Sequence, residues 1–165
     1  MLLPLIWVAC AVVIIRAALR SRRHPDALRT GRVAVGVLYI AAGAAVNAFF
    51  LLRGDDYAKF ADGSYIAFVR DTWRDLVVPH HETWIGLLIV FELAVGVLAL
   101  WGGRRTQLAY AAAIAFHFAL LSFGWGFYLW SIPMVAALAT LLRAEQHRQP
   151  STTRPVALVA GAKAA

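Results

Sequence analysis

Two ionisable side chains of this sequence lie deep inside apolar runs, where a charged group is rare. Glu92 and His117 are each about 12 residues, or ~18 Å along an ideal helix, from the basic turn at Arg104 and Arg105. Two helices joined by that turn would therefore carry both groups at the same depth. An ionisable group at mid-membrane costs roughly 2.5 to 3.5 kcal/mol unless it is paired or faces a cavity. We expect Glu92 and His117 to form a buried pair.

Two further polar residues lie on the preceding apolar run. Asn47 is about 15 residues, or ~22 Å along a helix, from the basic residue Arg32, which places it about one turn further out than the pair. Tyr39 lies deeper toward the basic side of the same run. We expect Asn47 to bond to the pair, and we take Asn47 and Tyr39 as candidate cofactor-binding residues beside Glu92.

These groups allow two kinds of role. Polar side chains that only bond one membrane helix to another contribute about 0.6 kcal/mol per contact. A carboxyl and an imidazole at mid-depth also suit a proton-accepting or quinone-binding site, with Glu92 and His117 as the candidate catalytic residues. A bis-histidine haem is disfavoured because His80 and His81 flank the far end of the run. The contiguous His80-His81-Glu82 lacks the spacing of a zinc site, so no metal site is predicted.

The elements that position these residues follow from composition. The chain has 165 residues, 61% hydrophobic and 15% charged, whereas soluble domains have about 45 to 50% and 25%. The pattern predicts an all-α, multi-pass transmembrane helix bundle, with no room for a separate soluble catalytic domain. The single cysteine, Cys10, rules out an intrachain disulfide and Cys-x-x-Cys redox chemistry. The net charge of +7 comes from basic residues clustered between apolar runs, which indicates membrane topology and not nucleic-acid binding.

The apolar runs divide into five predicted spans. The last run, 108–142, would measure roughly 50 Å as one helix, more than a hydrocarbon core of roughly 30 Å requires. We therefore divide it at 122–127, where two glycines and several aromatic residues supply a turn, and Pro133 then falls early in the fifth span. Within a bundle of residues 1–147, the spans are predicted at 2–19, 33–52, 83–102, 107–122 and 127–142.

The charges between the runs predict the orientation. Six arginines face one acid, Asp26, within 16–32, and two further basic clusters follow at 104–105 and 143–148. Short basic loops are cytoplasmic. Beyond Arg53, the connection 53–82 is net negative and is placed outside. These assignments predict an N-terminus outside, a cytoplasmic C-terminus and a disordered cytoplasmic tail over 148–165.

The outer connection also has helical periodicity. Apolar residues recur on one side of 64–78 and charged residues on the other, which predicts a short amphipathic outer helix begun by a Ser64 cap and ended by Pro79. Such a helix packs at the interface, or forms a lid or a docking face for a protein partner. The apolar positions are Ile66, Val69, Trp73, Leu76 and Val77.

Several short motifs resemble those of the DoxX-like family of small bacterial integral membrane proteins. They are Arg32-x3-Gly36 leading into Ala42-Gly43, the outer segment ending at Pro79, Glu92-Leu93-x2-Gly96, and the basic turn Gly103-Arg104-Arg105. The resemblance covers about 32–143. It implies a four-helix core, here with one N-terminal helix added, in a bacterial inner membrane. The family is named for subunits of a thiosulfate and quinone oxidoreductase, and its members are found with redox enzymes. By motif, the resemblance points to Glu92.

Three functions remain open at this stage. The first is a non-catalytic membrane subunit or scaffold of a redox-associated complex, with a partner docked at 64–78. The second is a quinone-interacting or proton-coupled redox component that uses Glu92 and His117. The third is a small-molecule transporter, although the chain shows no inverted repeat. The lipid bilayer is expected as the surroundings in each case, and a homo-oligomer is compatible with all three.

Overall fold

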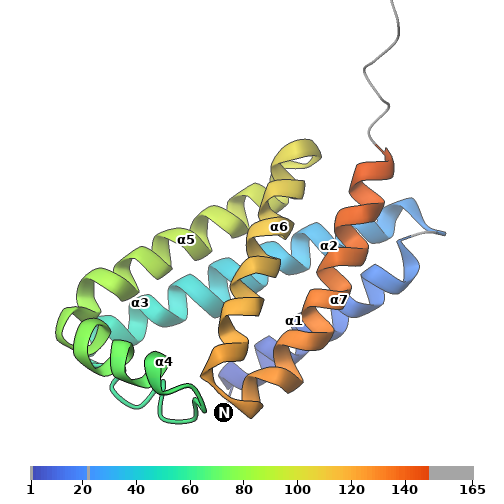
Figure 1. The fold of residues 1–165 in the computed structure, drawn as a ribbon. Coiled ribbons are helices and arrows are strands. Elements are labelled where there is room, and N and C mark those ends of the chain that lie inside the picture. Colours follow the sequence, from blue (N-terminus) through green and yellow to red (C-terminus); the bar gives the residue numbers. More distant parts are fainter. Residues whose placement is uncertain (1, 22, 149–165) are drawn as a thin grey trace, which may run out of the picture.

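The computed structural model describes residues 2–21 and 23–148, and the secondary structure of these residues is helical, which confirms the all-α prediction. The tail predicted over 148–165 lies, from residue 149 onward, outside the described residues. Figure 1 shows the helices arranged as an elongated bundle.

Two long helical runs form the first part of the bundle. Helix α1 spans Leu2–Arg20, and a short turn leads into α2, Pro25–Val37, which continues without a break through η1, Leu38–Ala44, and α3, Ala45–Leu52. This second run begins at Pro25, eight residues before the expected start at 33. Proline in the first turn and the acidic Asp26 are both favourable at a helix N-terminus, so the arginine-rich connection is largely helical.

The second part of the bundle follows the predicted order. Helix α5 spans His81–Trp101, α6 spans Gly103–Leu120, η4 spans Leu121–Phe123 and α7 spans Trp125–Arg148. The predicted break between the last two spans is confirmed, because Gly124 separates η4 from α7 with φ 122°.

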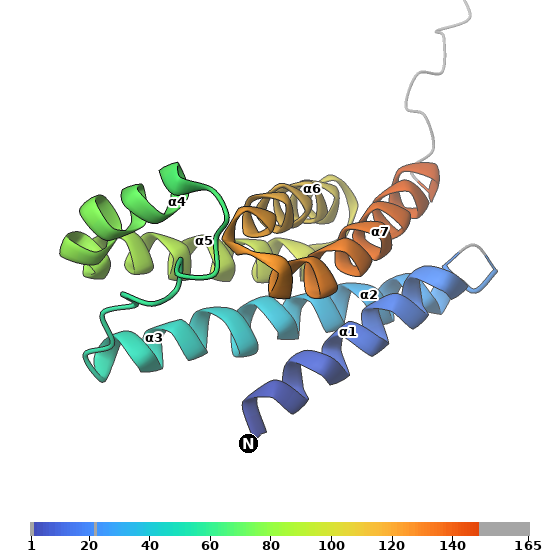
Figure 2. The same ribbon diagram turned by 60° about the horizontal axis from the view of Figure 1, so that its bottom comes forward.

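The predicted outer helix 64–78 occurs as three short helical segments that begin three residues later. They are α4, Ala67–Thr72, η2, Trp73–Val77, and η3, Val78–His80. The predicted Ser64 cap is wrong: Ile66 occupies the N-cap position, and the Ser64 hydroxyl accepts a hydrogen bond from the Ile66 N–H at 3.1 Å. At His80 the backbone leaves helical geometry, with φ −123° and ψ 31°, and the chain turns back before α5 (Figure 2).

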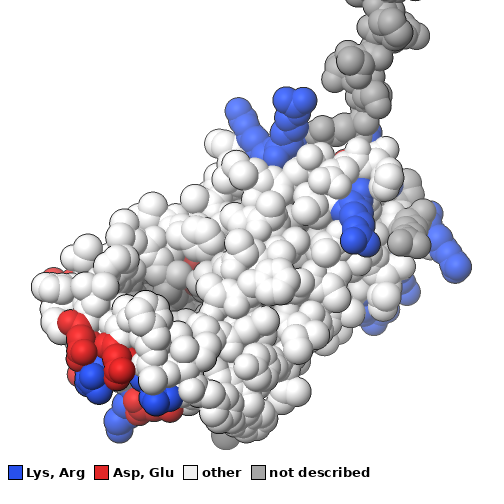
Figure 3. Space-filling model, viewed as in Figure 1, with Lys and Arg blue, Asp and Glu red and all other residues white. Residues whose placement is uncertain are grey.

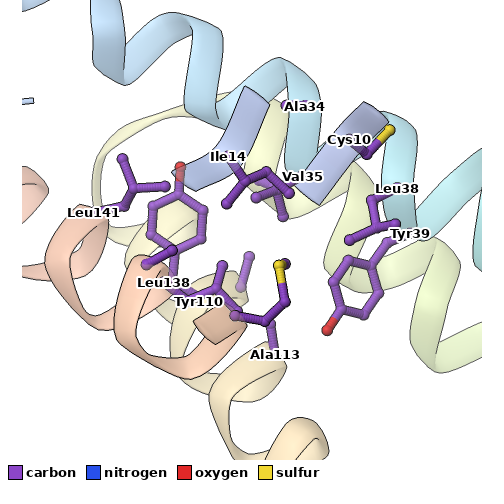
Figure 4. Packing of buried hydrophobic residues seen from close by; sticks show 14 of the residues in the cluster. Cys10, Ile14, Ala34, Val35, Leu38, Tyr39, Tyr110, Ala113, Leu138 and Leu141 are labelled. Atoms are coloured by element: carbon purple, nitrogen blue, oxygen red, sulfur yellow. The ribbon is translucent and has the colours of Figure 1, made fainter. Parts of the chain in front are cut away.

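The helices enclose one buried apolar cluster. Around the bundle, α1 contacts α2 and α7, α6 contacts α7 and α5, and α5 contacts α2 and η1. Side chains from α1, α2, η1, α6 and α7 converge between them, as Figure 4 shows for Ile14, Val35, Tyr39, Tyr110 and Leu138.

Four helices of the described chain are long and apolar enough to cross a membrane: Asp26–Leu52, Ala67–Trp101, Gly103–Phe123 and Trp125–Arg148. Large apolar side chains on their outer surfaces are exposed, such as Val90 at 63% and Leu129 at 73%. An apolar surface of this extent needs a lipid environment, so the chain forms a multi-pass membrane helix bundle. Figure 3 shows an uncharged belt between a mixed cluster of acidic and basic side chains at the end near α4, which we call the acidic end because the segment 53–82 is net negative, and basic side chains at the opposite end. We call the latter the arginine-rich end; there α1 and α7 finish and α2 and α6 begin.

Candidate functional site

The centre of the candidate site is the carboxyl group of Glu92, midway along α5 and only 5% exposed. The Asn47 side-chain amide donates a hydrogen bond from Nδ2 to Glu92 Oε2 at 2.9 Å. The expected bond between Asn47 and the mid-depth ionisable groups is confirmed for Glu92.

A glycine makes room for this carboxyl group. A Cβ added at Gly43 would lie 2.7 Å from Glu92 Oε1 and 2.8 Å from Glu92 Cδ, closer than non-bonded atoms approach. Gly43 belongs to η1, a π-helical stretch in which the Ala45 N–H bonds to the Ile40 carbonyl five residues back. Short π-helical stretches inside α-helices are frequent at functional sites. Here the wide turn brings a residue without a side chain against Glu92.

Tyr57, a residue that sequence reasoning missed, bonds to Asn47 from the loop that follows α3. Its hydroxyl donates to the Asn47 backbone carbonyl at 3.1 Å and lies 3.4 Å from Asn47 Oδ1. Burial raises the pKa of the Tyr57 phenol, and the nearby carboxylates of Asp55 and Glu92 raise it further, so the phenol stays a donor at neutral pH. No motif or periodicity marks this loop tyrosine.

The backbone at Tyr57 is unusual for a residue with a side chain. Its φ of 56° is in the left-handed region, which non-glycine residues seldom occupy. The Tyr57 N–H bonds to Asp55 Oδ1 at 2.8 Å, and the Trp73 indole donates to the Tyr57 carbonyl at 2.9 Å. These bonds hold the loop in the conformation that brings the phenol to Asn47.

The predicted Glu92–His117 pair is wrong. His117 Nδ1 lies 3.4 Å from the Ser131 hydroxyl on α7, and His117 Nε2 is buried with no hydrogen-bond partner in the part of the chain that the structure describes. The imidazole is close to Trp130, also on α7, with ring centroids 6.4 Å apart. Both predicted residues are buried on neighbouring helices, but α6 turns His117 toward α7 while α5 turns Glu92 toward η1 and α3.

Tyr39 completes the set of predicted site residues. It is 4% exposed, its ring meets Phe116 edge-on at 6.3 Å, and its hydroxyl has no hydrogen-bond partner among the described residues. Tyr39 is on η1, four residues before Gly43. A buried polar atom without a partner needs an explanation such as water or a ligand, so Tyr39 remains a candidate ligand-binding residue.

The surface near the middle of the bundle is hollowed. Figure 3 shows a hollow in the uncharged belt with acidic side-chain atoms visible inside it. Of the nine acidic residues, Glu92 alone lies away from both charged ends of the bundle. Within the described ranges, no group of three or more His, Cys, Asp or Glu residues could hold a metal ion.

No protein-family model, curated protein or solved structure matches this chain. Its site is therefore interpreted from its own contacts. The site consists of the Glu92 carboxyl group, midway along α5, and the Asn47 amide, which donates a hydrogen bond to one of its oxygens. The buried phenol of Tyr39 lies on the same helical run as Asn47.

Proposed function

We propose that this chain is a DoxX-like integral membrane protein that acts as a quinone-interacting, proton-coupled component of a redox-associated complex. One observation carries the proposal: the Glu92 carboxyl is buried at mid-membrane and has an amide partner but no cation. The ion pairs formed by the described residues involve Glu145, Asp71 and Asp75, and not Glu92. An ionisable group in such a position is a functional-site hypothesis by default.

The chemistry of the site suits a quinone carbonyl. Asn47 bonds to Glu92 Oε2, while Glu92 Oε1 accepts no hydrogen bond from the described residues. A carboxyl group can donate a hydrogen bond to a carbonyl when protonated and can take up a proton when ionised. The free Tyr39 hydroxyl supplies a second donor on the neighbouring run. His117 forms no hydrogen bond or ion pair with Glu92 and is bonded to Ser131, so we assign it no part in this step.

The proposal is tested by purifying the protein from native membranes in mild detergent and extracting bound quinone. Glu92→Gln keeps the shape of the side chain and an oxygen for Asn47, so the bundle should unfold at an unchanged midpoint. Glutamine also presents an N–H to a carbonyl, so Glu92→Gln should still retain quinone, whereas Glu92→Leu removes the donor and should reduce bound quinone by about 10-fold. The matched control is Glu82→Gln, which removes an exposed carboxyl at the start of the same helix.

Two results would contradict the proposal. Quinone recovered equally from the wild type, Glu92→Leu and Glu82→Gln would place its binding elsewhere. A fall in the unfolding midpoint without a change in bound quinone would show that Glu92 only bonds one helix to another.

A scaffold role is the second candidate function, and exposed apolar residues before and within α4 favour it. Tyr65 is 73% exposed, Ile66 49% and Phe68 76%. These side chains border the acidic end, where a partner protein or a second copy of the chain could dock. A protein recovered in stoichiometric amount from the same purification, with no quinone, would favour this role.

We also propose a bacterial inner-membrane location with the N-terminus outside and the C-terminus cytoplasmic. The arginine-rich end supports this orientation because basic loops are retained in the cytoplasm. Reporter fusions after Arg23, Arg105 and Arg148 should read as cytoplasmic, and a fusion after Asp62 as external. An external reading at Arg23 or Arg105 would reverse the assignment.

A further inference from the structure

A second polar site lies at the arginine-rich end, far from Glu92. There, the ends of α1 and α7 enclose a cleft of about 430 Å³. Ligand pockets in proteins measure roughly 300 to 1,000 Å³. The cleft is lined by Ser21, Thr140, Arg143, Ala144, His147 and Arg148.

The length of α7 sets the level in the membrane at which this cleft lies. The helix has 24 residues, or ~36 Å, and a hydrocarbon core is ~30 Å thick. Trp125, which is 64% exposed, begins α7 at the opposite end, where an indole ring suits the membrane interface. Arg143 then lies ~27 Å and His147 ~33 Å along the helix from Trp125. The cationic side of the cleft is at the level of lipid headgroups.

Two basic residues that line the cleft, Arg143 and His147, have no acidic partner among the described residues. The arginine-rich end carries nine arginines within the described residues, against the two carboxyl groups of Asp26 and Glu145. Glu145 is already engaged by Arg32, whose Nε and Nη2 donate to its two oxygens at 2.7 and 2.6 Å. Within the part of the chain that the structure describes, Arg143 and His147 form no ion pair. Arg143 and His147 on α7 can therefore donate hydrogen bonds to an anion that fits the cleft.

Both walls of the cleft supply hydroxyl groups, Ser21 beside α1 and Thr140 on α7. Ser21, at the end of α1, is 4% exposed, and its hydroxyl bonds to the Ala18 carbonyl at 2.8 Å. The Thr140 hydroxyl bonds to the Ala136 carbonyl at 2.8 Å. Each hydroxyl has a single hydrogen that can rotate, so either group donates to a ligand oxygen by exchanging its bond to the carbonyl for one to the ligand.

We propose that this cleft binds a phosphate group, with Arg143 as its charged donor and His147 as a further hydrogen-bond donor. Arginine matches the geometry of phosphate oxygens, and charge-assisted bonds of this kind are the strong ones. The depth of the cleft favours the phosphate of an anionic phospholipid over a soluble phosphate ester. The site is separate from Glu92 and does not depend on the quinone proposal.

The test is ligand titration of the purified protein in an uncharged detergent, followed by native mass spectrometry. The probes are dioleoylphosphatidylglycerol, dioleoylphosphatidylcholine and soluble glycerol 3-phosphate. We expect the anionic lipid to bind most tightly, and Arg143→Gln to weaken that binding by about 10-fold or more because one charge-assisted bond is lost. His147→Gln should weaken it as well.

The matched control is Arg104→Gln, at the exposed start of α6. It removes the same charge from the same end of the bundle but does not line the cleft. Equal loss of lipid binding in Arg104→Gln and Arg143→Gln would show attraction to the whole basic end and would overturn the proposed site. Binding of glycerol 3-phosphate that Arg143→Gln abolishes would keep the phosphate site but assign it to a soluble ligand. Unchanged unfolding midpoints for the exposed-residue variants would establish that the effects are on binding.

Discussion

Glu145→Ala is expected to lower the free energy of unfolding by about 3 kcal/mol, the scale for breaking a buried ion pair by removal of one partner. Arg32 on α2 donates two hydrogen bonds to Glu145 on α7, at 2.7 and 2.6 Å. The Glu145 side chain is 3% exposed and the Arg32 side chain 27%. Removal of the carboxylate leaves a partly buried guanidinium with neither its partner nor full access to water.

The arrangement of the helices adds to this effect. The guanidinium also lies against the turn between α5 and α6, where a Cβ added at Gly102 would be 2.8 Å from Arg32 Nη1. The ion pair therefore joins α2 to α7 beside the α5–α6 turn. Loss of the pair should loosen the arginine-rich end as a whole.

A double-mutant cycle measures the interaction directly. Equilibrium unfolding in detergent would compare Glu145→Ala, Arg32→Ala and the double variant, and we expect the double variant to be less destabilised than the sum of the singles by at least about 1 kcal/mol. Asp75→Ala is the control, because Asp75 pairs with Arg74 on an exposed surface, where water screens the charges and we expect little change in stability. Strictly additive effects of Glu145→Ala and Arg32→Ala would show that the pair does not stabilise the fold.

The bundle was largely predictable because membrane helices have a length set by the bilayer. The run 108–142 was too long for one span, and its division near Gly124 followed from glycine and aromatic content. The early start of α2 was missed because six arginines in 16–32 resemble a loop by composition, although Pro25 and Asp26 are typical of a helix N-terminus. The π-helical stretch η1 has no sequence signature that a periodicity analysis detects.

The sequence predicted how deep in the membrane the candidate site residues lie, but not which way each side chain points around its helix axis. Residue counts from the basic turns placed Asn47, Glu92 and His117 at similar depths, and the structure brings the first two together. The direction of each side chain about its helix axis depends on packing, which is why His117 meets Ser131 instead. Arg32 and Glu145 are 113 residues apart in the chain, so no local pattern connects them.

The site also depends on a turn far from it in sequence. Phe60 packs against Phe123 with ring centroids 5.0 Å apart, and the Ser64 hydroxyl donates to the Ser122 carbonyl at 2.5 Å. These contacts dock the loop that carries Tyr57 onto the turn between α6 and α7. Tyr57 in turn bonds to Asn47, and Asn47 bonds to Glu92. A shift of this turn would therefore displace the Glu92 carboxyl group through three successive contacts: turn to loop, Tyr57 to Asn47, and Asn47 to Glu92.

Gly124→Ala is therefore expected to damage both the fold and the site. The Gly124 φ of 122° is strained for any residue with a side chain, and an added Cβ would collide with the backbone carbonyl of Gly63. Backbone strain costs about 1 to 3 kcal/mol and overpacking about 1 to 3 kcal/mol more. We expect a loss of at least about 2 kcal/mol in the free energy of unfolding, because a backbone obstacle cannot rotate away as a side chain does.

Gly126→Ala separates this effect from a general response to alanine. Gly126 is two residues further along, inside α7, and an added Cβ there meets nothing within 4 Å. Alanine favours a helix over glycine by up to about 1 kcal/mol, so this control should unfold at the same midpoint or a higher one. In a background where the other five tryptophans are replaced by phenylalanine, quenching of Trp73 fluorescence by a water-soluble quencher would report on the loop, since the Trp73 indole bonds to the Tyr57 carbonyl. If Gly124→Ala matched Gly126→Ala in both unfolding and quenching, the turn would not hold the loop, and the link from this turn to Glu92 would be wrong.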